Sequence, residues 1–307
     1  MSVDGQLTVY RGPRSASGAL AALGRLKDRV RARTDAAVDA LLGEDAKRRI
    51  DSLSGTNDGP DEFGFDPRVA RYAVVAARAL YRSYFRTEVF GIENVPAGRV
   101  MLISNHSGQL PLDGMAIGAS LLLDAPRPRF IRSMVEKWTA TLPFVAEFFP
   151  RCGQVVGVPE NCIRLLESDE AVLVFPEGAR GISKTFEQRY KLTEFGLGFM
   201  RMALAAKAPI VPVAVIGAEE QYVSIANLEK LGQLIGMPAL PVMPQLLVPG
   251  GFLPLPTKYR IYFGEPLRFE GDPDDEDAAI EANVSAVKST IQSMINRGLK
   301  ERRAIFW

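Results

Sequence analysis

The chain contains a single histidine, His106, and its setting is typical of acid–base chemistry. The run VMLISNHSGQLPLDG places Asn105 and His106 just after a predicted strand, and Asp113 stands at the start of a predicted helix. A histidine in a loop at a strand end can act as a general base near neutral pH. A carboxylate on its other ring nitrogen would fix the tautomer and stabilise the imidazolium, and Asp113 is the candidate partner. The alternatives are a structural histidine and an aspartate that only caps its helix.

A second polar loop lies in the run VLVFPEGARG, which again ends a predicted strand. It places Glu177, Gly178 and Arg180 in a tight turn. Glycine permits close backbone approach to a ligand, while an acid and a guanidinium can bind a polyol or a phosphate. A turn closed by a surface ion pair is the alternative. Two polar loops at strand ends together favour a substrate site.

Short β-branched runs alternate with helical stretches in the middle of the chain. The runs are residues 87–90, 100–103, 129–131, 171–175, 210–216 and 259–263. This alternation predicts an α/β fold with a largely parallel central sheet flanked by helices. Ligands of such sheets bind beyond the carboxyl ends of the strands, which is where both polar loops lie.

Two helices rich in arginine are expected before the sheet. The first, from residue 17 to about 50, is an amphipathic arm whose apolar stripe is Leu23, Leu26, Val30, Ala37 and Leu41. Its basic face carries Arg25, Arg29 and Arg33. The second begins at the Asp66-Pro67 cap and runs to about residue 84, with Val69, Tyr72, Ala73, Ala76 and Leu80 as its stripe. The arginines can be solvated or can meet anionic lipid headgroups.

The last helix and the linkers suggest a division into three parts. A final segment starts with acidic residues, ends with basic ones and repeats apolar residues at helical spacing: Ile280, Val284, Val287, Ile291 and Met294. We expect this C-terminal helix to pack on the body of the protein. The predicted parts are an N-terminal helical arm with linker (1–65), an α/β domain (66–271) and the C-terminal helix (272–307).

Composition excludes several classes of protein. A formal net charge of +1 argues against a protein built to hold nucleic acid. Two cysteines are too few for a disulfide framework, and the amino terminus lacks the pattern of a secretory signal, so we expect a cytoplasmic protein. The uncharged run 231–257 carries six prolines, which rules out a spanning helix. This run could wall an apolar groove, enter a membrane interface or pack on the core, and residues 305–307 are a further candidate anchor.

With these residues in place, the chain resembles the phospholipid and glycerol acyltransferase family, which transfers fatty acyl groups from acyl-CoA or acyl carrier protein to lipid hydroxyls. Four blocks carry the resemblance in order: SNHSGQLPLDG, FFPRCGQVV, VLVFPEGARG and IVPVAVIG. They span about residues 85 to 265. The stretch after EGARG is similar to the branch that includes diacylglycerol acyltransferases.

The resemblance implies roles for matching residues. His106 would be the base and Asp113 its partner, while Glu177, Gly178 and Arg180 would shape the acceptor site, next to Asn105. The implied reaction needs no metal and no cofactor beyond the acyl-CoA or carrier-protein co-substrate. Its implied partner is a membrane lipid acceptor, which makes the expected enzyme a peripheral membrane protein.

Two departures from the family pattern matter. Six residues separate His106 from Asp113 where the family usually has four, so their contact depends on how the longer turn folds. The family's arginine after Gly153, which holds an acceptor phosphate, is missing, and this favours a neutral or bulky lipid acceptor. Four basic residues are either phosphate or CoA contacts or solvated charges: Arg151, Lys184, Arg189 and Lys191.

Other activities stay open at this point. A thioesterase or lipid hydrolase could use the same base on water, and a non-catalytic membrane lipid-binding protein is the alternative outside enzymology. A cysteine hydrolase is less credible, because Cys152 and Cys162 would both need the one histidine.

Overall fold

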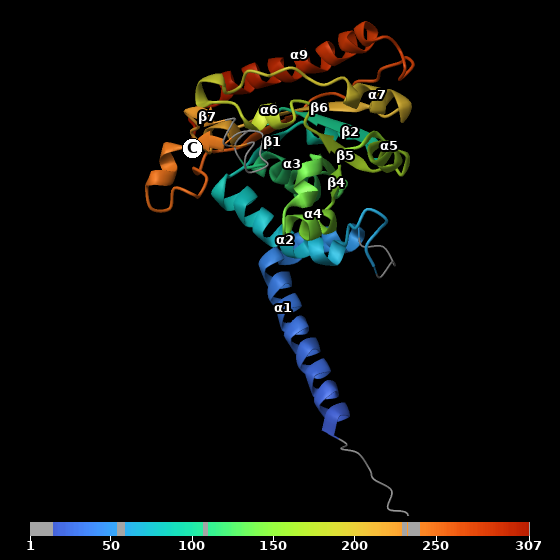
Figure 1. Ribbon diagram of the computed structural model, residues 1–307, viewed down its shortest axis with the longest axis vertical. Coiled ribbons are helices and arrows are strands. Elements are labelled where there is room, and N and C mark those ends of the chain that lie inside the picture. The colour runs from blue at the N-terminus through green and yellow to red at the C-terminus, as the bar shows by residue number, and fades with distance from the viewer. Residues whose placement is uncertain (1–14, 54–58, 107–109, 229–231, 233–239, 307) are drawn as a thin grey trace, which may run out of the picture.

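The structure, a computed structural model, describes residues 15–53, 59–106, 110–228, 232 and 240–306 (Figure 1). Its strands in chain order are β1 (Glu88–Phe90), β2 (Val100–Ser104), β3 (Ile131–Val135), β4 (Gln154–Val156), β5 (Ala171–Val174), β6 (Ile210–Ile216), β7 (Ala226–Leu228), β8 (Leu240–Val242) and β9 (Arg260–Phe263). Its helices are α1 (Ser15–Leu53), α2 (Pro67–Ala79), α3 (Leu112–Leu123), α4 (Val145–Arg151), α5 (Pro159–Glu167), α6 (Ala179–Ile182), α7 (Gly198–Ala205) and α9 (Asp277–Glu301).

One mixed sheet forms the centre of the molecule, with the strand order β1-β9-β6-β2-β5-β3-β4. All neighbouring strands are parallel except β6 and β9, which pair antiparallel. The predicted α/β fold with a largely parallel sheet is therefore confirmed. Because β2 lies between β5 and β6, the loops that follow these three strands meet at one edge.

Helices cover both faces of the sheet, and the pleat sorts the core residues between them. Along β2, Val100 and Leu102 join the cluster beneath α1, α2 and α3, whereas Met101 and Ile103 join the cluster beneath α5, α7 and α9. All four side chains are fully buried. A strand buried on both faces needs a continuous apolar run, which explains why β2 shows no polar alternation.

The predicted strands agree with the observed ones except in the third case. The run 129–131 was expected as a strand, but the strand is Ile131–Val135, and Arg129 lies before it with its guanidinium on backbone carbonyls. The sequence did not predict β4, β7 or β8. Each has three residues, a length that gives only a weak apolar signal, although the equally short β1 was predicted.

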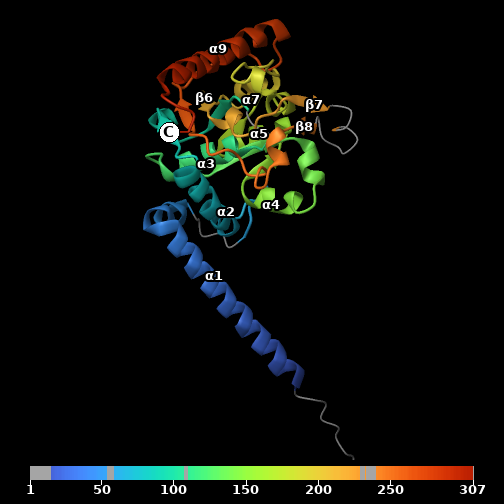
Figure 2. The same ribbon diagram turned by 90° about the vertical axis from the view of Figure 1, so that its left-hand side faces the viewer.

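Helix α1 is interrupted at Gly43, which has φ 75° and ψ 160°, and the part before this residue extends away from the body (Figures 1 and 2). The packing stripe expected on α1 is wrong. Leu23, Leu26, Val30 and Leu41 are 57–64% exposed. The face that contacts the body lies near the carboxyl end of the helix and consists of Val38, Leu42, Ala46 and Ile50. Alanines on several faces let more than one stripe satisfy the same helical period, so periodicity could not choose between them.

The buried face of α2 also differs from the predicted apolar stripe. Tyr72 and Ala76 are exposed, while Ala70 is buried and Val74 packs against the core. The helix begins as predicted, because the Asp66 side chain accepts a hydrogen bond from the backbone N–H of Arg68 at 3.0 Å. All four arginines of the α2 region have intramolecular partners: Arg68 on Asp66, Arg71 on Asp39, Arg78 on the carbonyl of Leu41 and Arg82 on Asp124.

The C-terminal helix packs as expected. Its repeat Ile280, Val284, Val287, Ile291 and Met294 is buried against the sheet side that carries β6. The three-part division of the chain remains a prediction. Among the described residues, every helix is either too short or too polar to cross a bilayer.

Candidate active site

His106 lies at the carboxyl end of β2, and its neighbour Asn105 fixes that strand end. The Asn105 amide nitrogen donates to the Val215 carbonyl at 3.1 Å, and its oxygen accepts from the Val215 N–H at 2.8 Å. Asn105 is fully buried. Since both ends of its amide are bonded to β6, its geometry supports the strand end rather than a contact with substrate.

The structure brings His106 and Asp113 together. The imidazole Nδ1 lies 2.8 Å from Asp113 Oδ2, and Asp113 Oδ1 accepts the N–H of Gly114 at 2.8 Å. Asp113 is fully buried in the first turn of α3, while the His106 side chain is 13% exposed. Part of the six-residue spacer, residues 107–109, lies outside the described residues. With Nδ1–H donating to the carboxylate, Nε2 carries the lone pair that a general base needs.

Two neighbours confine the His106 ring, and neither was singled out from the sequence. The Phe175 ring stacks on the imidazole with 4.0 Å between centroids and 21° between planes. A Cβ at Gly181, in α6, would come within 2.8 Å of the His106 Cβ, so a side chain there would displace the histidine. Phe175 directly follows β5, so the rule that chemistry follows strand ends could have found it.

Glu177 supports the backbone at His106. It is 2% exposed, and its Oε1 accepts the backbone N–H of His106 at 3.1 Å. Its Oε2 accepts the N–H of Thr193 at 2.8 Å and the hydroxyl of Thr193 at 3.0 Å. Both carboxylate oxygens are therefore engaged inside the protein, which argues against a direct contact with the acceptor.

The other two residues of the second loop lie nearer the surface. Gly178 has φ 55° and ψ −145°, a conformation that side chains with a Cβ rarely adopt. Arg180 is the exposed member of the site, and its guanidinium lies 3.6 Å from the exposed carboxylate of Glu194. It therefore remains accessible to an anionic group of a substrate.

Lys184 is buried, which a phosphate or CoA contact would not require. Its ammonium lies 3.1 Å from Glu219 Oε1, 3.4 Å from Glu177 Oε2 and 3.4 Å from the carbonyl of Lys191. These three acceptors account for its three protons. The sequence did not single out Glu219, although it stands just beyond the end of β6. Burial raises the pKa of the Glu219 carboxyl to about 7, against the opposing effect of the Lys184 ammonium.

Gln221 is a further connection that the sequence did not reveal. Its amide nitrogen donates to the carbonyl of Leu110 at 3.0 Å, and its oxygen accepts the hydroxyl of Tyr259 at 2.5 Å. It thus ties the chain after β6 to the segment that leads into α3.

The cysteines have no features of nucleophiles. Burial raises the pKa of the Cys152 thiol to about 11 and that of Cys162 to about 12. Both are therefore protonated at neutral pH, which supports the earlier argument against a cysteine hydrolase. In the described part of the chain, no group of three or more His, Cys, Asp and Glu side chains is placed to bind a metal ion.

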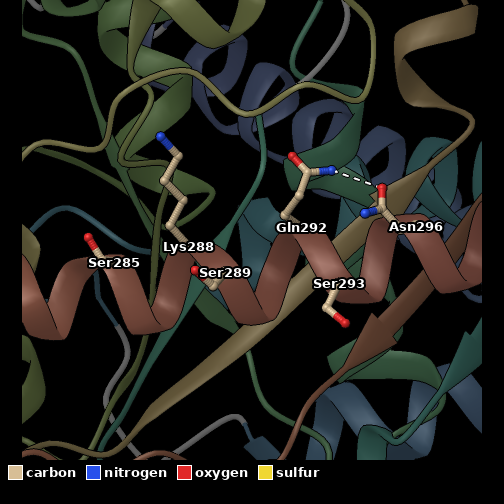
Figure 3. A pocket seen from close by; sticks show the side chains of 6 residues that line it. All are labelled: Ser285, Lys288, Ser289, Gln292, Ser293 and Asn296. Atoms are coloured by element: carbon tan, nitrogen blue, oxygen red, sulfur yellow. Dashed lines mark hydrogen bonds between the residues drawn. The ribbon is translucent and has the colours of Figure 1, made fainter.

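A hollow of about 540 Å³ lies along α9 (Figure 3). Its lining comes from this one helix: Ser285, Lys288, Ser289, Gln292, Ser293 and Asn296. The side chains point to different sides, and the hydrogen bond drawn among them joins Gln292 to Asn296. Because the groups do not converge, the hollow is no rival to the His106 site.

Comparison with known proteins adds a family to this geometry. The family model described as Acyltransferase matches residues 86–216, a range that contains β2, β5, β6 and both polar loops. The chain is 39% identical to uncharacterized proteins of Mycobacterium leprae and Mycobacterium tuberculosis over 257 residues. The alignment covers 80% of this chain and 70% and 71% of those proteins.

More distant similarities extend beyond bacteria. The chain is 25% identical over 213 residues to the "DGAT1/2-independent enzyme synthesizing storage lipids" of Gallus gallus, covering 69% of this chain and 60% of that protein. The crystal structure of the 1-acyl-sn-glycerophosphate (LPA) acyltransferase PlsC from Thermotoga maritima has a similar fold. The TM-score is 0.50 at 18% identity, with 76% of this chain and 83% of that chain covered.

Proposed function

Because the chain belongs to the acyltransferase family, we propose that it transfers a fatty acyl group to a hydroxyl of a glycerolipid or lysophospholipid, with His106 as general base. The donor is acyl-CoA or acyl carrier protein. The observation that supports this proposal most strongly is the 2.8 Å contact between His106 Nδ1 and the buried Asp113, next to a partly exposed imidazole.

The proposed reaction uses the two ring nitrogens differently. His106 Nε2 takes the proton of the acceptor hydroxyl as that oxygen attacks the thioester carbonyl, while Asp113 stabilises the imidazolium. The C–O bond forms, the C–S bond breaks, and the proton passes from the imidazolium to the leaving thiolate. Backbone N–H groups of the site loops would stabilise the oxyanion. The proposal requires no metal and no cofactor besides the thioester.

We propose an acceptor without a phosphate next to its reacting hydroxyl, such as mono- or diacylglycerol. The segment after Gly153 forms β4 and carries no arginine. Lys184 is buried in ion pairs, so it offers no replacement. The printed name of the Gallus gallus relative, an enzyme of storage-lipid synthesis, agrees with a neutral acceptor.

A lipid acceptor requires a membrane-facing surface, and we assign it to the apolar loop formed by residues 244–253. This loop contains no charged residue, and five of its side chains are 49–88% exposed: Leu246, Leu247, Val248, Phe252 and Leu253. It appears in orange at the left of Figure 1 and faces the viewer in Figure 2. Exposed apolar side chains of this number are typical of an interaction surface.

The apolar loop is anchored close to the histidine segment. Tyr222 donates its hydroxyl to the carbonyl of Phe252 at 2.8 Å, and the N–H of Leu255 donates to the carbonyl of Gln221 at 2.7 Å. Gln221 in turn bonds to Leu110. A lipid taken up at the loop would therefore enter next to His106, and we propose a peripheral enzyme at the cytoplasmic membrane surface. The earlier part of the uncharged run (231, 233–239) and Trp307 lie outside the described residues.

The test is a transfer assay with wild type and His106→Gln. Radiolabelled acyl-CoA or acyl carrier protein thioester is offered with monoacylglycerol, diacylglycerol or lysophospholipids in vesicles, or with glycerol phosphate in solution. We expect labelled glycerolipid from the wild type only. Thioester consumption without an acceptor would instead indicate a hydrolase. Vesicle binding without transfer from any donor would indicate a lipid-binding protein, and preference for glycerol phosphate would contradict the neutral acceptor.

A further inference from the structure

Three buried charged residues lie behind the His106 loop, and they come from three different loops. Glu177 follows β5, Lys184 follows α6, and Glu219 lies in the single turn Ala218–Glu220 after β6. Their exposed fractions are 2%, 8% and 6%. The Lys184 ammonium lies 3.4 Å from Glu177 and 3.1 Å from Glu219, so one cation joins two carboxylates.

The order of the strands places Lys184 between two strand ends. Since β2 lies between β5 and β6, Lys184 connects the ends of the two strands that flank the one carrying His106. Glu177 accepts the backbone N–H of His106, and Glu219 Oε2 accepts the N–H of Tyr190 at 2.8 Å. The ion triad thus spans the strand end and holds the histidine backbone through Glu177.

From this geometry we infer that Lys184 and Glu219 are positioning residues for His106, acting through Glu177. The inference rests on the proposed function, because His106 is the base only there. Without the ammonium, two buried carboxylates would face each other without a cation, and Glu177 would be drawn toward water or a proton. Either change moves the His106 backbone. A displacement of a catalytic group by about 1 Å can lower turnover on the order of 100-fold.

The first test compares Lys184→Met with Arg132→Met. Arg132 is also a buried cation beside two carboxylates, Asp61 and Glu170, but it lies at the opposite end of the sheet. Both variants should lose stability. We expect Lys184→Met to lower kcat about 10- to 100-fold with KM within about 3-fold of wild type, and Arg132→Met to keep kcat. Equal kcat values for Lys184→Met and wild type would overturn the inference, as would an equal loss in both variants.

The second test is a double-mutant cycle with Glu219→Gln. In the Lys184→Met background, this change removes the carboxylate that faces Glu177, so kcat should recover by about 3-fold or more over Lys184→Met alone. A role limited to general stability predicts a further loss instead. Additive losses in the cycle would therefore contradict the positioning role.

A readout without turnover separates this inference from the proposed function. Because the chain has one histidine, a single set of imidazole proton signals reports on His106 by NMR. At fixed pH those signals should move in Lys184→Met and stay in Arg132→Met. If the wild type transfers no acyl group, the proposed function fails while this measurement still decides the inference. Unmoved signals in Lys184→Met would reject it.

Discussion

Two buried cations, Lys184 and Arg132, each lie beside two carboxylates, at opposite ends of the same sheet. Lys184 joins Glu177 and Glu219, and Glu177 is bonded directly to the backbone of His106. A partly exposed imidazole therefore ends this chain of contacts, and solvent or substrate can reach it.

The Arg132 cluster contacts no described residue of the candidate site, and its two carboxylates are themselves partly exposed. Arg132 lies near the start of β3, and its guanidinium lies 2.6 Å from Asp61 and 3.6 Å from Glu170. The rings of Phe63 and Phe65 lie beside it, with centroids 5.5 and 5.0 Å from the guanidinium carbon. This cluster attaches residues 61–65 of the predicted linker to the sheet. Buried charge alone thus does not mark an active site; what the charge touches does.

The largest expected effect is that of His106→Gln, which removes the proposed base but keeps a polar side chain of similar length. We expect kcat to fall about 100- to 10,000-fold, the usual contribution of general-base catalysis. The measurement is the transfer assay, with thermal unfolding as the control for folding. Normal turnover in this variant would show that His106 is not the base, and the Lys184 cluster would then have no catalytic residue to support.

Asp113→Asn should follow, with kcat lowered on the order of 100-fold. An amide cannot offer the negative charge that stabilises the imidazolium, and its NH₂ can reverse the tautomer of His106. The matched control is Asp124→Asn at the other end of α3, where the carboxylate contacts Tyr81 and Arg82 instead. Equal losses in the two variants would show that the helix, and not the pair, matters.

The apolar loop can be tested by the double variant Leu247→Asp/Phe252→Asp. Both side chains are strongly exposed, so the fold should tolerate the change, while vesicle affinity should fall about 10- to 100-fold. Co-sedimentation with phospholipid vesicles measures it. The comparison is Leu26→Asp/Val30→Asp on the exposed face of α1. If only the α1 variant released the protein from vesicles, the membrane surface would be the arm.

Arg132→Met should leave turnover unchanged and lower the free energy of unfolding by about 2 kcal/mol. The loss leaves carboxylates unpaired, but Asp61 is 36% exposed and can be solvated, which limits the cost. Chemical denaturation measures the change. A large fall in kcat at unchanged stability would contradict this prediction and would show that the Arg132 cluster has a functional role.

The last expected effect is a pH dependence of stability carried by Glu219, and it concerns folding rather than turnover. Its raised pKa, about 7 in the folded state, means that the folded protein keeps a proton that the unfolded chain has lost. This contribution to stability is fully present below the unfolded pKa of about 4.3 and is lost as pH rises through 7. Between pH 5 and 8 it amounts to up to about 3 kcal/mol, and Glu219→Gln should abolish it. Identical pH slopes of denaturation in both proteins would contradict the shift.

Much of the fold could be predicted because long, uniform patterns carry strong signals. The seven-residue strand β6 and the apolar repeat of α9 were placed correctly, since each buries a regular set of side chains. The faces of α1 and α2 were not, because alanine-rich helices offer several equivalent stripes. The three-residue strands β4, β7 and β8 also escaped, because their partners rather than their composition define them, whereas the equally short β1 was predicted.

The residues of the candidate site were also predicted only in part. Motif order pointed to His106, Asp113 and Glu177 as residues at strand ends. It also assigned Lys184 a possible ligand contact, whereas the structure buries this residue between carboxylates. Glu219 lies 35 residues from Lys184, and no local pattern links them.

The sequence by itself determined the kind of chemistry, because reactivity belongs to residue types: one histidine, one nearby aspartate and an uncharged run that no spanning helix can use. Only the tertiary structure decided which of these residues are accessible and which are buried in contacts with other residues. Strand order creates that distinction, since the position of β2 between β5 and β6 depends on crossovers and packing across the whole domain. A lysine or a glutamate is therefore buried in ion pairs or exposed to solvent depending on which strand end it follows.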